Sequence, residues 1–168
     1  MKIAFTGAQG TGKTTLYNNL IVETLPLKTL NQLKLYESYG RKIPKEEYGL
    51  PKTQHKFNRW YISRHYFNPH FLSARSIYDT WAYSKLTAGP WFDYYKFCWA
   101  IKNIYYDHLF YVPIEFEPVA DGIRSVDPEF QKDVDREIKA ILDYYHVPYN
   151  IIKGSIEERI ALLKSIIK

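Results

Sequence analysis

A glycine-rich segment near the start of the chain has the residue types and spacing of a phosphate-binding loop. Residues 7–14 read GAQGTGKT and fit G-x-x-x-x-G-K-[ST] at every fixed position. Glycines allow a tight turn that brings backbone N–H groups close to an anion. Lys13 would reach the β- and γ-phosphates of a nucleoside triphosphate, and the Thr14 hydroxyl would bind Mg²⁺. The residues expected to bind ATP are Gly7, Gln9, Gly10, Thr11, Gly12, Lys13, Thr14 and Thr15.

The segments on either side of this loop have the secondary structure that the motif requires. Residues 2–6 are apolar enough for a short buried strand, and residues 12–24 have a helical pattern with Leu16, Leu20 and Ile21 on one face. The helix would direct the positive end of its dipole at the bound phosphates. The order of strand, loop and helix therefore supports a nucleotide site.

Length and composition are those of one globular domain, residues 1–168. Cys98 is the only cysteine, so no intramolecular disulfide can form. No apolar run is long enough to cross a bilayer. We therefore expect an intracellular protein without a membrane partner, in the cytoplasm, or in the host cytoplasm if a phage encodes it.

The positive charge is concentrated in one segment, residues 41–75. This segment has eight Lys or Arg residues and two Glu, a net charge of +6, whereas the whole chain carries +5. Such a segment attracts polyanions, either the phosphates of a nucleotide or DNA. Arg41, Arg59 and Arg64 are the candidate acceptor-binding residues, and a solvated basic helix is the alternative.

Short strands alternate with helices along the whole chain, which predicts an α/β fold with a parallel sheet covered on both faces. In such sheets, ligands bind beyond the carboxyl ends of the strands. The residues that follow the predicted strands should therefore lie together at one edge. The predicted strands are 2–6, 33–36, 70–73, 108–112 and 149–152.

Two candidate catalytic residues come at the ends of predicted strands. Glu37 follows the second strand, where its carboxylate could orient or deprotonate an acceptor hydroxyl. Arg75 follows the third strand, where a guanidinium could bind phosphate through two hydrogen bonds. The structural alternative for Glu37 is an ordinary surface residue.

Two further candidates lie in the following helix and in a loop. Asp79 falls in the first turn of a predicted helix, where it has either a functional role or only a favourable interaction with the helix dipole. Arg124 lies in the irregular segment 113–127, interpreted as a lid that closes over the transferring phosphate. The alternative is an ordinary turn with a solvated arginine.

An aromatic run covers residues 91–106, which are predicted to form one helix. Its members include Trp91, Tyr94, Tyr95, Phe97 and Trp99. Packing in the core is the favoured role, and stacking on a nucleic-acid base is the less favoured one.

Several motifs in order give the chain its resemblance to the small P-loop kinase-like family that is related to nucleoside and nucleotide kinases and has many phage members. After the phosphate loop come Glu37 with Arg41, the run RSxxDTxAY from Arg75, YDHLF from Tyr106, DGIRS from Asp121 and GSxxER from Gly154. The resemblance implies a three-layer fold with five parallel strands in the order 2-3-1-4-5. It also implies that Glu37 acts as a base, Arg75 binds acceptor or phosphate, and Arg124 is the lid arginine.

The chain departs from the family pattern at one position. Relatives have an acid directly before the arginine of the third-strand motif, where this chain has Ala74. That acid helps to hold the magnesium shell, so Asp79 or Asp121 would have to replace it. Thr14 and Asp79 are therefore the candidate magnesium ligands.

Three functions remain open from the sequence. The leading one is transfer of the γ-phosphate from ATP·Mg²⁺ to a nucleoside- or nucleotide-like acceptor, with Lys13, Glu37, Arg75 and Arg124 as catalytic residues. The second is a DNA-modifying kinase that phosphorylates a hydroxymethylated pyrimidine within phage DNA and binds the DNA through residues 41–75. The third is a switch or binding module that hydrolyses nucleotide slowly, which Ala74 favours.

Overall fold

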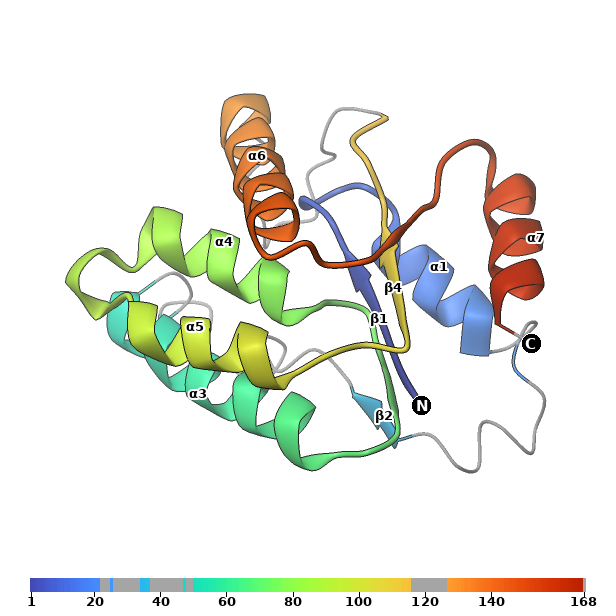
Figure 1. Cartoon of the computed structure of the whole chain (residues 1–168). Helices are drawn as coiled ribbons and strands as arrows, with labels where there is room; N and C mark the ends of the chain where they lie inside the picture. Colours follow the sequence, from blue (N-terminus) through green and yellow to red (C-terminus); the bar gives the residue numbers. More distant parts are fainter. Residues whose placement is uncertain (22–24, 26–33, 37–46, 48–49, 116–126, 168) are drawn as a thin grey trace.

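The computed structural model describes residues 1–21, 25, 34–36, 47, 50–115 and 127–167. In this part of the chain, five parallel strands form one sheet in the order β2-β3-β1-β4-β5 (Figure 1). This is the order that the family resemblance implies. The strands are β1 (Lys2–Thr6), β2 (Lys34–Tyr36), β3 (Phe71–Ser73), β4 (His108–Tyr111) and β5 (Asn150–Ile151).

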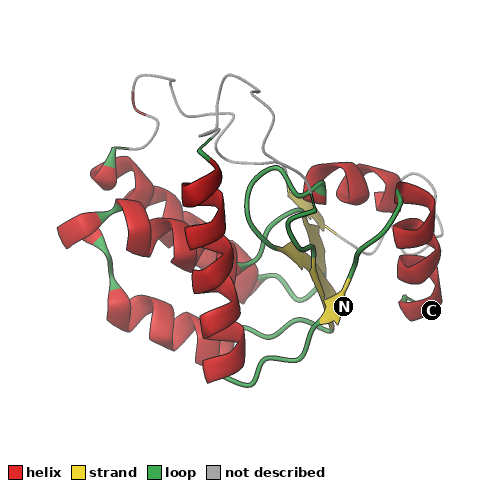
Figure 2. Cartoon of the chain, turned by 90° about the horizontal axis from the view of Figure 1, so that it is seen from above, coloured by secondary structure: helices red, strands yellow, loops and turns green. Residues whose placement is uncertain are grey.

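Helices cover both faces of the sheet, because its central strands are apolar on both sides. Ile3 and Phe5 of β1 face one core cluster, and Ala4 between them faces the other. Figures 1 and 2 show one pair of helices on the first face and four helices on the second. The first face is covered by α1 (Lys13–Asn19) and α7 (Ile156–Ile166), and the second by α3 (Pro51–Phe67), α4 (Ile77–Thr87), α5 (Tyr94–Asn103) and α6 (Pro128–Tyr144).

Side-chain caps fix where several helices begin. The Asp127 side chain accepts a hydrogen bond from the Glu129 N–H (2.9 Å), and Pro128 takes the first helical position of α6. Ser155 and Glu158 form a reciprocal capping box at the start of α7. The α7 cap fixes the start of that helix beside the phosphate loop.

The predicted helix over 91–106 is wrong in its extent. Gly89–Trp91 is a short 3₁₀ turn (η4), and α5 begins only after Asp93, whose side chain accepts a hydrogen bond from the Lys96 N–H at 3.0 Å. The helix ends at Asn103, because Ile104 is extended. The cap and the extended residue therefore limit the helix to ten residues.

The predicted core role of the aromatic run is also wrong for most of its members. Phe97 is buried, but five other rings are exposed by 44–85%. Helical spacing directs Phe97, Ala100 and Ile101 to the core, so the rings on the other side of α5 face solvent. The exposed rings are Trp91, Tyr94, Tyr95, Trp99 and Tyr105.

A buried histidine holds α3 against β3 and the start of α4. The Tyr106 hydroxyl accepts a hydrogen bond from the Ile77 N–H (2.9 Å) and shares a second hydrogen bond with Nδ1 of His65 (2.8 Å). The imidazole also packs against the rings of Tyr61 and Phe71. Burial, together with the nearby charge of Lys2, lowers the pKa of His65 to about 3, so the folded protein holds this side chain neutral at ordinary pH.

Acid should therefore destabilise the fold through His65. A histidine in the unfolded chain titrates near pH 6.5, so between that pH and 3 the unfolded state binds a proton that the folded state does not. The free energy of unfolding then falls as pH is lowered, by up to about 1.4 kcal/mol per pH unit. His65→Phe should be less stable at pH 7 but lose this pH dependence, as measured by urea denaturation from neutral to mildly acidic pH. Equal slopes for both proteins would contradict the assignment.

Candidate nucleotide and phosphoryl-transfer site

The phosphate loop joins β1 to α1 at the carboxyl edge of the sheet (Figure 1). All three of its glycines have a positive φ, a backbone conformation that other residues rarely adopt. Gly7 has a φ of 141°, and a Cβ there would lie 2.4 Å from the carbonyl oxygen of Val112. Gly12, with a φ of 91°, is the left-handed N-cap of α1. The loop therefore closes tightly over the end of β4 and leads directly into the positive end of the α1 dipole.

Lys13 lies inside the loop and is only 6% exposed. Its ammonium group donates to the carbonyl oxygens of Gly7 (2.6 Å) and Ala8. It also lies 3.9 Å from Oδ1 of Asp79 on α4. The lysine is therefore held inside the loop, and its predicted contact with the β- and γ-phosphates stays a prediction.

Asp79 is completely buried and connects the phosphate loop to the start of α4. Its Oδ1 accepts a hydrogen bond from the Gly7 N–H (3.2 Å), and its Oδ2 accepts from the N–H (2.9 Å) and hydroxyl (2.7 Å) of Ser76. The Ser76 side chain in turn caps α4, which completes a capping box. The carboxylate is thus a structural bridge between the segments that follow β1 and β3.

The predicted magnesium role of Asp79 stays a prediction. Both of its oxygens already accept hydrogen bonds, whereas Thr14, at the second position of α1, is exposed. Over the described residues, no group of three or more His, Cys, Asp or Glu side chains could hold a metal ion. Ala74 packs against the apolar cluster that contains Ile3 and Phe5 of β1. Asp121 lies outside the described residues.

Arg75 is connected to the phosphate loop through the side chain of Tyr83. Its guanidinium lies over the Tyr83 ring, 5.3 Å from the centroid, and the Tyr83 hydroxyl donates to Oε1 of Gln9 at 2.6 Å. The Tyr61 hydroxyl fixes the backbone of the same arginine by donating to its carbonyl oxygen at 2.6 Å. Arg75 therefore lies at the carboxyl edge, where the sequence predicts it.

A buried arginine on α7 is the site residue that the sequence did not single out. Arg159 is 3% exposed and donates to the carbonyl oxygens of Gly154 (Nε, 2.8 Å) and Thr11 (Nη1, 3.2 Å), and through Nη2 to the carboxylate of Glu115. Glu115 also accepts a hydrogen bond from the Gly154 N–H at 3.1 Å. One ion pair thus joins the phosphate loop, the segment after β4 and the turn before α7. Its signal in the sequence was the motif GSxxER.

The remaining predicted site residues separate into two groups. Glu37, Arg41 and Arg124 lie outside the described residues, as does most of the predicted lid. Arg59 and Arg64 lie on α3: Arg59 lines a groove with Lys96 of α5, and Arg64 lies over the Trp60 ring, 5.6 Å from its centroid. No contact between these two arginines and the phosphate loop is seen among the described residues, so their acceptor-binding role stays a prediction.

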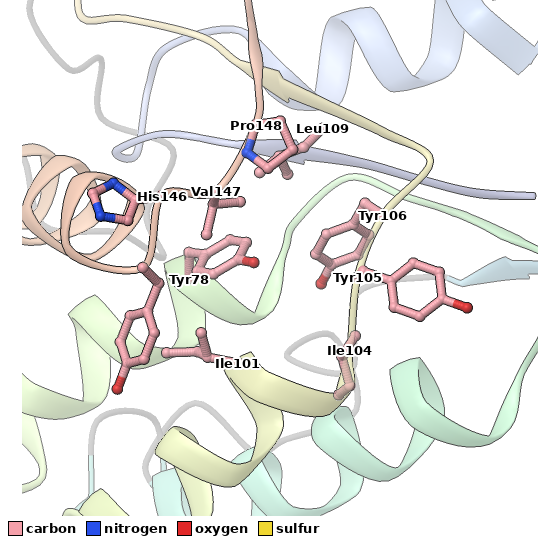
Figure 3. A pocket seen from close by; sticks show the side chains of 10 residues that line it. Tyr78, Ile101, Ile104, Tyr105, Tyr106, Leu109, His146, Val147 and Pro148 are labelled. Carbon is pink, nitrogen blue, oxygen red and sulfur yellow. The ribbon is translucent and has the colours of Figure 1, made fainter.

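A separate cavity of about 180 Å³ lies at the other edge of the sheet (Figure 3). It is lined by Tyr105 and Tyr106 before β4, by Tyr78 of α4, and by residues 145–148 after α6. Because the strands are parallel, their amino ends meet on this side, away from the phosphate loop. The cavity is therefore not part of the candidate site.

Comparison with known proteins agrees with this geometry. The profile of a family described as an AAA domain matches residues 2–159. The chain belongs to this family. No curated protein sequence matches the chain. Over the described residues, no helix has the length and apolar character that crossing a membrane requires.

Solved structures similar to this AAA domain protein include kinases of nucleosides and nucleotides. Deoxyadenosine kinase from M. mycoides, with products dCMP and a flexible dCDP bound, is 16% identical over 98% of this chain and 97% of its own, with a TM-score of 0.66. The NadR protein in complex with NR is 18% identical over 99% of this chain but 50% of its own (TM-score 0.70). Thymidylate kinase from Ehrlichia chaffeensis is 18% identical over 99% of this chain and 98% of its own, with a TM-score of 0.58. These matches confirm the predicted α/β P-loop kinase fold.

Removing the Asp79 charge should destabilise the protein. In Asp79→Asn the amide nitrogen cannot accept from Ser76 or Gly7, so at least one buried donor is left unsatisfied, at a cost of about 1–3 kcal/mol in the free energy of unfolding. Chemical denaturation measures this loss. Asp133→Asn, on the exposed side of α6, is the matched control and should change stability by less than about 0.5 kcal/mol. A loss no greater than that of the control would rule out the bridging role.

Proposed function

We propose that the protein transfers the γ-phosphate of ATP to a nucleoside- or nucleotide-like acceptor. The observation that supports this most strongly is the Asp79 bridge, because it fixes the Lys13 loop and the helix start that carries Arg75 as one unit. A phosphate cradle and a guanidinium at neighbouring strand ends are what phosphoryl transfer requires, since positioning and charge stabilisation supply most of its catalysis.

The loop fits the phosphates of a nucleotide. Its backbone N–H groups and the start of α1 offer positive ends of dipoles, and the ammonium of Lys13 is already at the centre. The Nε2 of Gln9 is buried and has no hydrogen-bond partner among the described residues, so it is a further donor at this site. Thr14 would hold Mg²⁺, which offsets phosphate charge when it is bound.

Of the three residues proposed to act on the acceptor, only Arg75 lies within the described residues. Arg75 would bind the acceptor or its phosphate through its forked N–H groups. Glu37 would orient or deprotonate the acceptor hydroxyl, and Arg124 would neutralise charge as the phosphate moves. The solved structures named above, a deoxyadenosine kinase and a thymidylate kinase among them, support a nucleoside-like or nucleotide-like acceptor.

Transfer from γ-labelled ATP·Mg²⁺ to a panel of acceptors tests the proposal. The panel contains nucleosides, nucleoside monophosphates, nicotinamide riboside, and DNA with and without hydroxymethylated pyrimidines. Lys13→Ala should lower labelling by about 100- to 1,000-fold, because it removes the cation that reaches the transferring phosphate. Lys132→Ala, an exposed lysine on α6, is the control and should label as the wild type does. Release of inorganic phosphate at the same rate with and without acceptors would reject the kinase in favour of a slow nucleotide-hydrolysing switch.

Arg75→Lys separates charge from geometry on the acceptor side. Lysine keeps the positive charge but loses the planar fork, so kcat/KM for the acceptor should fall by about 10- to 100-fold. Steady-state kinetics with varied acceptor at saturating ATP measures this change. A higher KM for ATP, with no change in kcat/KM for the acceptor, would instead assign Arg75 to binding of the phosphate donor.

A DNA-modifying kinase is the second candidate, and one observation favours it. The helices α3 and α5 contain six Lys or Arg residues and no Asp or Glu. A kinase for small acceptors does not need such an excess, whereas a DNA substrate would be attracted by it. Label in hydroxymethylated DNA, and in none of the free nucleosides, would select this candidate.

A further inference from the structure

A groove with an unusual combination of residues lies between α3 and α5. The two helices pack side by side (Figure 1) and enclose a groove of about 260 Å³. Its lining includes the cations Arg59 and Lys96 and the aromatic rings of Tyr66, Phe67 and Trp99. None of these side chains takes part in the contacts of the phosphate loop described above.

Cations outnumber acids on this surface. Neither α3 nor α5 contains an acidic residue, and the carboxylate that acts on Lys96 is that of Asp93, which caps α5. Partial burial lowers the pKa of Lys96, and the neighbouring charge of Arg59 lowers it further. An anion in the groove would relieve this repulsion. The cations on the two helices are Lys52, Lys56, Arg59, Arg64, Lys96 and Lys102.

Three exposed aromatic rings lie beside these cations, with the Tyr66 ring tilted by 55° to that of Trp99 and by 78° to that of Phe67. The Phe67 side chain is 76% exposed, that of Trp99 44% and that of Tyr66 40%. The Tyr66 ring lies 4.8 Å from that of Trp99 and 5.0 Å from that of Phe67, measured between centroids. Flat rings with exposed faces next to positive charges are the combination that proteins use to hold unpaired bases, with stacking on the rings and ion pairing to the phosphates.

We propose that this groove binds single-stranded nucleic acid, with bases stacked on Trp99, Tyr66 and Phe67 and phosphates paired with Arg59 and Lys96. The helical rise from Arg59 to Tyr66 is about 10 Å, which is room for about three bases at 3.4 Å each. Single strands fit better than duplexes, because paired bases do not offer their faces to side chains. A second copy of the chain would bring together two surfaces on which cations outnumber acids, and repulsion between like charges opposes this.

Fluorescence anisotropy with a labelled oligothymidine of about 12 nucleotides tests the proposal. The wild-type protein should bind, and its affinity should fall as salt rises, with a log–log slope of about −0.7 for each phosphate contacted. Phe67→Ala should weaken binding by about tenfold or more, because it removes a stacking surface. Since Phe67 is mostly exposed, this variant should fold normally. Arg59→Gln combined with Lys96→Gln should lower affinity and reduce the magnitude of the slope by about 1.4.

Matched controls lie on α6. Tyr144→Ala removes an equally exposed ring, and Lys132→Gln with Arg136→Gln removes the same charge. Both controls should bind as the wild type does. Lys13→Ala should also bind normally, which keeps this inference separate from the proposed phosphoryl transfer.

Three results would overturn the proposal. The first is no binding of the single strand at low salt, and the second is an equal loss of affinity in the groove variants and the α6 controls. The third is tighter binding of a matched duplex than of the single strand. Self-association that Phe67→Ala abolishes, without any oligonucleotide binding, would assign the groove to a second copy of the chain.

Discussion

The buried carboxylate of Asp79 is the interaction on which the candidate site depends. An ionised group without solvent is tolerated only when donors or a countercharge surround it, and Asp79 has three hydrogen-bond donors and a lysine within 4 Å. Because these donors come from the segments that follow β1 and β3, the carboxylate specifies how the two segments fit together. The phosphate loop and the start of α4 are therefore held as one rigid unit.

Arg159 provides the corresponding contact from the opposite side of the loop. Its guanidinium ties the Thr11 carbonyl to Glu115 and to the turn that precedes α7. The phosphate loop is thus held by the carboxylate of Asp79 from one layer of helices and by the guanidinium of Arg159 from the other. Such support limits movement of the backbone N–H groups, and a preorganised set of donors is what stabilises a developing negative charge most effectively.

The sequence predicted the parts of this arrangement that are encoded locally. The loop motif and the alternation of strands and helices each depend on residues within a few positions of one another. The roles of Asp79 and Arg159 depend on partners far away in the chain, Gly7 and Glu115, so spacing alone could not reveal them. The aromatic run was misjudged because ring content does not indicate which side of a helix faces the core, and because the cap at Asp93 shortens the helix.

The surface charges of the helices differ in a way that the fold alone does not require. On α6, cations pair with acids three or four residues away, as Lys132 does with Glu129 and Lys139 with Asp135, so its charges largely compensate. On α3 and α5 no such acids are present, and the cations instead lie beside exposed rings. Uncompensated like charge opposes stability through repulsion, exposed aromatic surface favours association, and the two features occur together on these helices. A partner that is both anionic and aromatic accounts for the two features at once, whereas phosphoryl transfer to a small acceptor accounts for neither.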